Sequence, residues 1–287
     1  MPNEGLAARP NAEAWEQLTK PFSTFLDHAE EAGRALEAST RGISVLVGMP
    51  RVMEALQAVK EPPDAGEKDD APERLRHARE LADFAKGQVD KGFPLLYGQA
   101  LVSLWGELEA LVEDFLVVWF QNTPDALRIE QVARLKVPLA QFETLDAEER
   151  IRLLVHELED NLRATFRAGV VRFEALLSVI GMSGDVDPQV KRDLYEMNHV
   201  RNVIVHKAST ADRRFAEACP WLGVKPGTPL KVTAADWVRY SGAVHSYNLN
   251  LINRLRVACG KKPYVTNEKA AEPSAPTKDI ESPPSAR

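Results

Sequence analysis

The chain has 287 residues, of which 44% are hydrophobic and 27% charged, as is usual for a globular protein. Its formal net charge of -6 excludes a strong positive field that would draw the whole molecule to nucleic acid or anionic lipid. Any contact with nucleic acid therefore requires a local basic patch. Two cysteines, Cys219 and Cys259, are too few for a disulfide framework and lack the spacing of a metal site.

The first residues, MPNEGLAARPNAEAWEQ, do not show the cationic start and apolar core of a secretory signal. The longest fully apolar run, residues 115–120, is too short to cross a bilayer. We therefore expect a cytoplasmic protein with no membrane partner, and we expect no cofactor and no metal.

Residues 1–60 are expected to form an N-terminal helical extension, because apolar residues recur at helical intervals from residue 12 onward. Gly42 and Gly48-Met49-Pro50 are expected to interrupt it. Residues 61–72, EPPDAGEKDDAP, are charged, rich in proline and unable to bury enough apolar surface to offset the entropy of ordering. We interpret this stretch as a linker or loop that precedes the main helical domain, residues 73–260.

The most hydrophobic segment, residues 95–121, predicts a long core helix with a broad apolar stripe. Glu109 interrupts that stripe. A carboxylate among aromatic and leucine side chains must be paired, or its pKa must rise. Two interpretations stay open: Glu109 pairs with a cation such as Arg201 or a histidine of a neighbouring helix, or it lies at the edge of the stripe and reaches solvent.

The remaining pattern is also helical, so the predicted fold class is all-α. A short helix is expected over residues 125–135. A longer one is expected to start at a capping box formed by Asp146 and Glu149 and to end or bend near Gly169. Residues 219–232 predict a short irregular or β-hairpin insert, and Thr233 and Asp236 predict a capping box before the last helix. Residues 261–287 predict a disordered tail.

Residues 187–210, DPQVKRDLYEMNHVRNVIVHKAST, predict a helix capped by Asp187. Tyr195, His199, Asn202 and His206 are spaced by four, three and four residues and therefore share one face. Leu194, Met197, Ile204 and Ala208 mark a second, apolar face. Arg201 precedes His206 by five residues, which places it roughly 140° around the axis and about 7.5 Å along it.

These residue types suit cleavage of RNA without a metal. Histidine can take a proton from the ribose 2′-hydroxyl near neutral pH, and the arginine fork matches phosphate oxygens. Asn202 can orient the imidazole or donate to phosphate. Six Lys/Arg against three acids between residues 191 and 214 predict a modest basic patch, although a solvated helix end has the same pattern. A purely structural cluster of Arg201, His206 and Glu109 is a further interpretation.

The run Arg201-Asn202-Val-Ile-Val-His206 resembles the R-N-x-x-x-H form of the Rx4–6H motif of HEPN domains, which include many prokaryotic ribonuclease toxins. Leu108-Glu109 in the long apolar helix looks like the acidic element that precedes the motif in this family. Residues 169–182 and the stretch from Arg214 to the terminal helix are similar to a subgroup of the family. The resemblance covers residues 93–258.

The resemblance implies a HEPN-like helical bundle and a metal-independent endoribonuclease, acting as a toxin or phage-defence effector. Its composite site would lie at a homodimer interface, where Arg201 contacts phosphate, Asn202 supports the site, His206 is the acid–base group and Glu109 is the acidic partner. We expect Lys207, Arg213 and Arg214 to bind RNA.

Val200, Val203 and Ile204 are expected to contact the second copy, since two-fold contacts are the commonest oligomer interface. An antitoxin or defence-system protein is a further expected partner. Some HEPN toxins carry a tyrosine two residues after the histidine as a modification site; here that residue is Ala208, so such modification is not expected. The alternative is a non-catalytic HEPN scaffold that binds RNA, a nucleotide or a protein partner.

Overall fold

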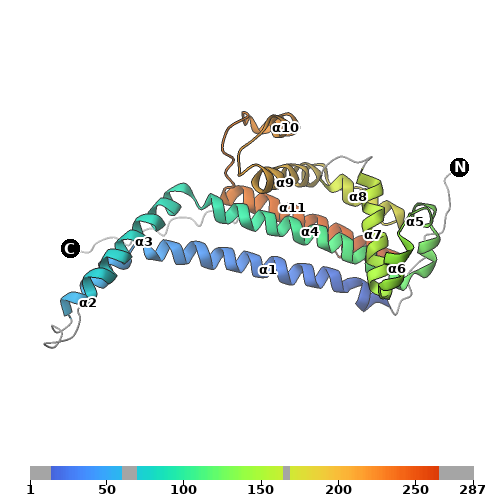
Figure 1. Ribbon diagram of the computed structural model, residues 1–287, viewed down its shortest axis with the longest axis horizontal. Helices are drawn as coiled ribbons and strands as arrows, with labels where there is room; N and C mark the ends of the chain where they lie inside the picture. The colour runs from blue at the N-terminus through green and yellow to red at the C-terminus, as the bar shows by residue number, and fades with distance from the viewer. Residues whose placement is uncertain (1–13, 60–69, 164–168, 265–287) are drawn as a thin grey trace, which may run out of the picture.

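The computed structural model describes residues 14–59, 70–163 and 169–264, and these form an all-α protein (Figure 1). The α-helices are α1 (Trp15–Leu46), α2 (Met49–Val59), α3 (Ala71–Lys91), α4 (Pro94–Asn122), α5 (Glu130–Ala133), α6 (Leu139–Thr144), α7 (Ala147–Arg163), α8 (Val170–Val179), α9 (Pro188–His206), α10 (Arg213–Ala218) and α11 (Ala234–Ala258). The 3-10 helices η2 (Pro124–Arg128) and η3 (Pro220–Leu222) lie between them. The predicted fold class is therefore confirmed.

Helix α4 is the centre of the bundle, because most of its circumference is apolar and buried from Leu101 to Phe120. Helices α1, α9 and α11 lie along it (Figure 1). Phe22 of α1 meets Phe115 of α4 edge to face, with ring centroids 5.3 Å apart. The helix expected in the N-terminal extension thus contributes the first half of its length to the same core as α4.

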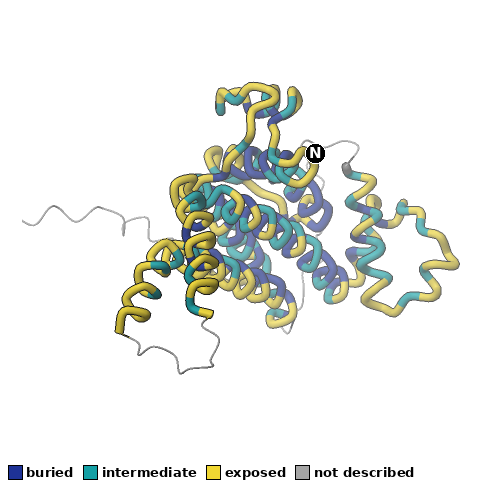
Figure 2. The backbone as a smooth tube through the Cα atoms, turned by 60° about the vertical axis from the view of Figure 1, so that its left-hand side comes forward, coloured by how far each residue is buried: buried dark blue, intermediate teal, exposed yellow. Residues whose placement is uncertain are grey.

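Helices α2 and α3 form a helical hairpin at one end of the molecule. Helix α1 runs through Gly42 and breaks only at Val47 and Gly48, where α2 turns away by 51°. Helix α2 packs on α3 but buries none of its own residues, and the hairpin is mostly exposed (Figure 2). Helix α3 begins at Ala71, so the described end of the proposed linker is already helical; residues 61–69 lie outside the described ranges.

Over the described ranges, no single helix is both long and apolar enough to cross a membrane. Among the helices that the structure describes, the bent pair α1 and α2, taken together, meets the length and composition of a broken span.

Helices α7 and α8 close the other end of the bundle. The predicted capping box is confirmed: the Glu149 amide donates to Asp146 and the Asp146 amide donates to Glu149, each at 2.9 Å. Gly169 begins α8 with a φ of +84°, and a β-carbon there would stand 2.8 Å from the Cα of Tyr195. The absence of a side chain at Gly169 therefore permits the close approach of α8 to α9.

Helix α9 starts as expected, with Asp187 accepting hydrogen bonds from the amides of the first turn. Val200 and Val203 are each 3% exposed and belong to the chain's own core, so the expectation that they contact a second copy is wrong. Ile204 is partly exposed, and Ala208 lies beyond the helix with a φ of +47°. The periodicity predicted Leu194 and Met197 correctly as buried, but Ala208, which is exposed, does not belong to the apolar face.

The chain between α9 and α11 projects from the bundle and holds α10 and η3 (Figure 1). Its ends are joined by one isolated antiparallel bridge, Thr210 to Pro229, so the insert is irregular and not a β-hairpin. The capping box of Thr233 and Asp236 is confirmed at the start of α11. Of the predicted tail, residues 261–264 pack back on α11, where the Tyr264 amide donates to Asn253 at 2.6 Å; residues 265–287 lie outside the described ranges, as do residues 1–13.

Candidate functional site

The polar face predicted for α9 exists and opens onto a pocket. The rings of Tyr195 and His199 are 4.5 Å apart between centroids. His199, Asn202 and exposed His206 line a cavity of about 300 Å³ together with residues of the insert. The other lining residues are Val203, Lys207, Asp212, Arg214 and Phe215. We call this cavity the His206 pocket.

Arg201 faces a different cavity of about 570 Å³, bounded by residues of α4, α7, α8 and α9. Glu109 Oε2 lies 3.7 Å from Arg201 Nη2, and Glu109 Oε1 lies 3.2 Å from Arg172 Nη1. The side chains of Glu109 and Arg201 are 27% and 26% exposed. The interpretation in which Glu109 pairs with Arg201 is therefore confirmed. We call this cavity the Glu109 cavity.

Arg172 is a member of the Glu109 cavity that sequence reasoning missed. It also forms an ion pair with Glu159 of α7. The signal was available, because Arg172 interrupts the apolar run of α8 in the same way as Glu109 interrupts that of α4. The Nε atoms of Arg172 and Arg201 are buried and have no hydrogen-bond partner among the described residues. A buried donor without a hydrogen-bond partner lowers the stability of the folded protein.

Asn202 connects the two cavities. Its Oδ1 accepts a hydrogen bond of 3.1 Å from Arg201 Nη1, while the residue lines the His206 pocket. The structure thus brings Glu109, Arg201 and Asn202 together and leaves His206 outside their cluster. The interpretation of Arg201, His206 and Glu109 as one structural cluster is wrong for His206.

Some of the cations around the His206 pocket have an ion-pair partner among the described residues, and one does not. Lys207 Nζ lies 3.8 Å from Asp212, and Arg213 lies outside the pocket lining with its Nε 2.7 Å from Glu217. Arg214 lines the pocket and has no ion-pair partner in the described part of the chain. Of the three predicted RNA-binding residues, Lys207 and Arg214 therefore reach the pocket.

His199 lies at the inner side of the same pocket. Burial lowers the pKa of its imidazole below the ordinary 6.5, and the charge of Arg214 lowers it further, against an opposing effect of Asp212. Its Nε2 is buried without a hydrogen-bond partner among the described residues. A neutral imidazole at this position adds no positive charge to the pocket at neutral pH.

A buried charged network that the sequence did not indicate lies on the side of α9 that faces α11. Asp193 and Glu196 are 5% and 1% exposed, and both accept hydrogen bonds from Arg239 of α11. The Tyr240 hydroxyl and the Trp221 Nε1 also donate to Glu196, each at 2.6 Å. Burial opposes the charge of Glu196, but these hydrogen bonds outweigh it and lower its pKa below the ordinary 4.5.

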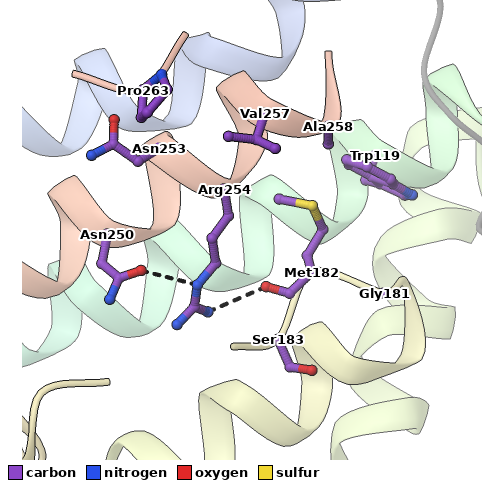
Figure 3. Close-up of a pocket in the computed structure, with 10 residues that line it drawn as sticks. All are labelled: Trp119, Gly181, Met182, Ser183, Asn250, Asn253, Arg254, Val257, Ala258 and Pro263. Carbon is purple, nitrogen blue, oxygen red and sulfur yellow. Dashed lines mark hydrogen bonds between the residues drawn. The ribbon is translucent and has the colours of Figure 1, made fainter. Parts of the chain in front are cut away.

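A further cavity of about 520 Å³ lies beside the end of α11 and holds none of the predicted site residues (Figure 3). Arg254 extends into it and donates to Asn250 and to the carbonyl of Met182 (Figure 3). The same guanidinium donates to both oxygens of Glu174, at 2.8 and 2.9 Å. These contacts tie α11 to α8, so we assign Arg254 a structural role.

Over the described ranges, no group of three or more His, Cys, Asp or Glu side chains is placed to hold a metal ion. Comparisons with protein-family models, curated proteins and solved structures find no match. The candidate site therefore rests on its residues and their geometry.

Proposed function

We propose that the chain is a HEPN-type endoribonuclease that cleaves cytoplasmic RNA without a metal. The observation that carries the proposal is the position of His206: exposed at the last residue of α9, in a pocket with Lys207 and Arg214. In the proposed reaction, His206 accepts the proton of a ribose 2′-hydroxyl as that oxygen attacks the adjacent phosphorus. The bond to the 5′-oxygen breaks, and an imidazolium returns a proton to the leaving oxygen.

A second copy of the chain would supply the arginine. Arg201 and His206 of one chain open onto separate cavities, so they do not face the same phosphate. Apolar surface near His206 is available for a two-fold contact, because Val205 is 48% exposed and Leu95 is 64% exposed. Ile204, partly exposed beside Val205, lies near Gly98, one turn after Leu95: a β-carbon added at Gly98 would be 3.5 Å from Ile204 Cδ1. These residues replace Val200 and Val203 as the proposed contact.

Glu109 and Asn202 would hold Arg201 in place before substrate binds. When Arg201 turns toward a phosphate, it gives up its long contact of 3.7 Å with Glu109. Glu109 keeps Arg172 at 3.2 Å, so its carboxylate is not left unpaired. The arrangement supports a role for Glu109 as the acidic partner that positions Arg201.

One observation favours the alternative, a non-catalytic scaffold that binds RNA, a nucleotide or a protein. Arg201 is already engaged by Glu109 and Asn202, away from His206. Such a protein would bind through the cations at the end of α9 and leave its ligand intact. The two proposals differ in whether His206 is needed for turnover.

The deciding experiment incubates purified protein with labelled RNA in EDTA. We expect His206→Ala to lower the cleavage rate by about 10²–10⁴-fold, as for loss of a general acid–base group. His77→Ala is the matched control, since His77 is an exposed histidine on α3. Equal cleavage by wild type and His206→Ala would disprove the enzyme. If wild type binds RNA without cleaving it and Arg214→Gln weakens binding, the scaffold is supported instead.

A further inference from the structure

Trp221 is an aromatic residue held at the surface by a buried anchor. It lies in η3 and is 41% exposed, while its Nε1 donates to the buried Glu196. The guanidinium of Arg192 lies 4.7 Å from the ring centroid, and the ring of Tyr195 lies 6.2 Å from it. The indole orientation is therefore fixed although much of the ring faces solvent.

A pocket of about 290 Å³ opens beside this ring. Val170, Val171, Pro188, Lys191, Arg192, Tyr195 and Trp221 line it. We call it the Trp221 pocket. Its apolar and aromatic surfaces suit a flat ring, and its two cations, both on the exposed side of α9, suit an attached anion.

The Trp221 pocket and the His206 pocket lie on one face of α9. Tyr195 lines the first, His199 lines the second, and their rings are 4.5 Å apart. From Tyr195 to His206 the helix rises by about 16 Å. The two pockets are thus consecutive parts of one surface between α9 and the insert.

This surface is positively charged although the chain as a whole is negative. The two acids of α9 after its first turn, Asp193 and Glu196, lie in the interior and are paired with Arg239. Lys191, Arg192 and Arg214 have no carboxylate partner within the described ranges. Asp212, the acid of the His206 pocket, is paired with Lys207. The local excess of cations is the electrostatic condition for phosphate contacts.

We propose that the two pockets form one groove for single-stranded RNA. A nucleobase occupies the Trp221 pocket and stacks on Trp221 and Tyr195, while Lys191, Arg192 and Arg214 contact phosphates and lead the strand to His206. A duplex keeps its bases stacked on one another, so only an unpaired base reaches the ring. The choice of RNA rests on the proposed function; the stacking pocket rests on the geometry of Trp221.

The experiment measures binding apart from cleavage. A labelled oligoribonucleotide with 2′-O-methyl groups cannot be cleaved by attack of the 2′-oxygen, and its affinity is followed by fluorescence anisotropy. We expect Trp221→Leu to weaken binding by about 5–100-fold and Trp221→Phe to keep most of the affinity, because stacking needs an aromatic ring. Phe84→Leu, at an aromatic residue that is 60% exposed on α3, is the control and leaves affinity unchanged. Thermal melting verifies that each variant is folded.

Two further measurements test whether Lys191 and Arg192 contact phosphates and whether the groove prefers single-stranded RNA to a duplex. The double variant Lys191→Gln/Arg192→Gln is expected to lower the slope of log affinity against log salt by about 1–2. The same oligonucleotide annealed to its complement is expected to bind at least about tenfold more weakly.

Three outcomes overturn the groove: wild-type affinity in Trp221→Leu, equal loss in Trp221→Leu and Trp221→Phe, or equal binding of single strand and duplex. The result is separable from the enzyme proposal. A protein that binds the uncleavable strand through Trp221 but cleaves nothing supports the groove and contradicts the nuclease. If cleavage depends on His206 but Trp221→Leu does not change the affinity, the nuclease is supported and the groove is contradicted.

Discussion

The Nε1 of Trp221 lies 2.6 Å from Oε2 of Glu196, so a solvent-facing indole is fastened to a carboxylate that is only 1% exposed. Glu196 also accepts from Tyr240 and Arg239 of α11. The surface proposed to bind RNA and the contact between α9 and α11 therefore depend on the same side chain. A change at Glu196 is expected to affect both stability and ligand binding.

Glu196→Gln is expected to destabilise the protein by about 1–3 kcal/mol, because the amide leaves part of a buried, charge-assisted hydrogen-bond network unsatisfied. Calorimetric melting measures the loss. Glu217→Gln is the control, since Glu217 pairs with Arg213 on the exposed surface and such pairs contribute little. A melting temperature unchanged by Glu196→Gln would show that the network does not stabilise the fold.

The same carboxylate predicts an acid sensitivity. The pKa of Glu196 is lower in the folded protein than its ordinary 4.5, so the unfolded chain takes up the proton first as pH falls. Its contribution to stability is complete above about pH 4.5 and is lost as pH falls toward the folded pKa. Denaturant titrations at several pH values should show a steeper acid loss for wild type than for Glu196→Gln. Parallel curves would contradict the lowered pKa.

His199 is expected to titrate below pH 6.5, with burial as the larger cause and Arg214 as the second. Its imidazole signals in NMR spectra report the midpoint directly. Arg214→Gln should raise this midpoint but leave it below 6.5, because burial remains. Arg213→Gln, a cation outside the pocket lining, should not change it. A midpoint at or above 6.5 in the wild type would contradict the assigned environment.

Mixing two inactive variants tests the composite site. Arg201→Ala and His206→Ala should each be inactive, whereas an equimolar, re-equilibrated mixture should recover about a quarter of wild-type cleavage. Random pairing makes half of the dimers mixed, and each mixed dimer has one intact site out of two. In the control, the double variant Arg201→Ala/His206→Ala is mixed with wild type: its mixed dimers contain no intact site, so about a quarter of wild-type cleavage remains from the wild-type homodimers, whereas a site within one chain would leave about half. No recovery in the mixture of single variants would place the reaction within one chain.

The sequence predicted the elements well, because helix periodicity and capping are local. It also predicted the pairing of Glu109, since a carboxylate in an apolar stripe needs a partner. It did not reveal the partners of α9: apolar Val200 and Val203 fit a core or an interface equally well. Asp193 and Glu196 were counted with the surface charge, because Arg239 is more than forty residues away along the chain and only tertiary packing brings it close.

The sequence also did not reveal that α1 packs on α4, because this contact too joins helices that are far apart along the chain. A proline-rich, charged stretch at residues 61–72 resembles a boundary between domains, whereas the helices beside it pack as a hairpin and α1 joins the core. The sequence also did not reveal that Trp221 lies at the surface with its Nε1 bound to a buried carboxylate. The hydrogen bond that orients its indole goes to Glu196, a residue 25 positions earlier in the chain.

The close approach at Gly169 limits which residues this position can accept. A β-carbon would meet the backbone of Tyr195 at 2.8 Å, and the φ of +84° is itself unfavourable for other residues. Gly169→Ala should therefore cost about 1–3 kcal/mol, whereas Gly106→Ala, with open space around the added carbon, should stabilise α4 by about 0.5–1 kcal/mol. In a library randomised at both positions and selected for folded protein, we expect only glycine to survive at 169 and many residues at 106.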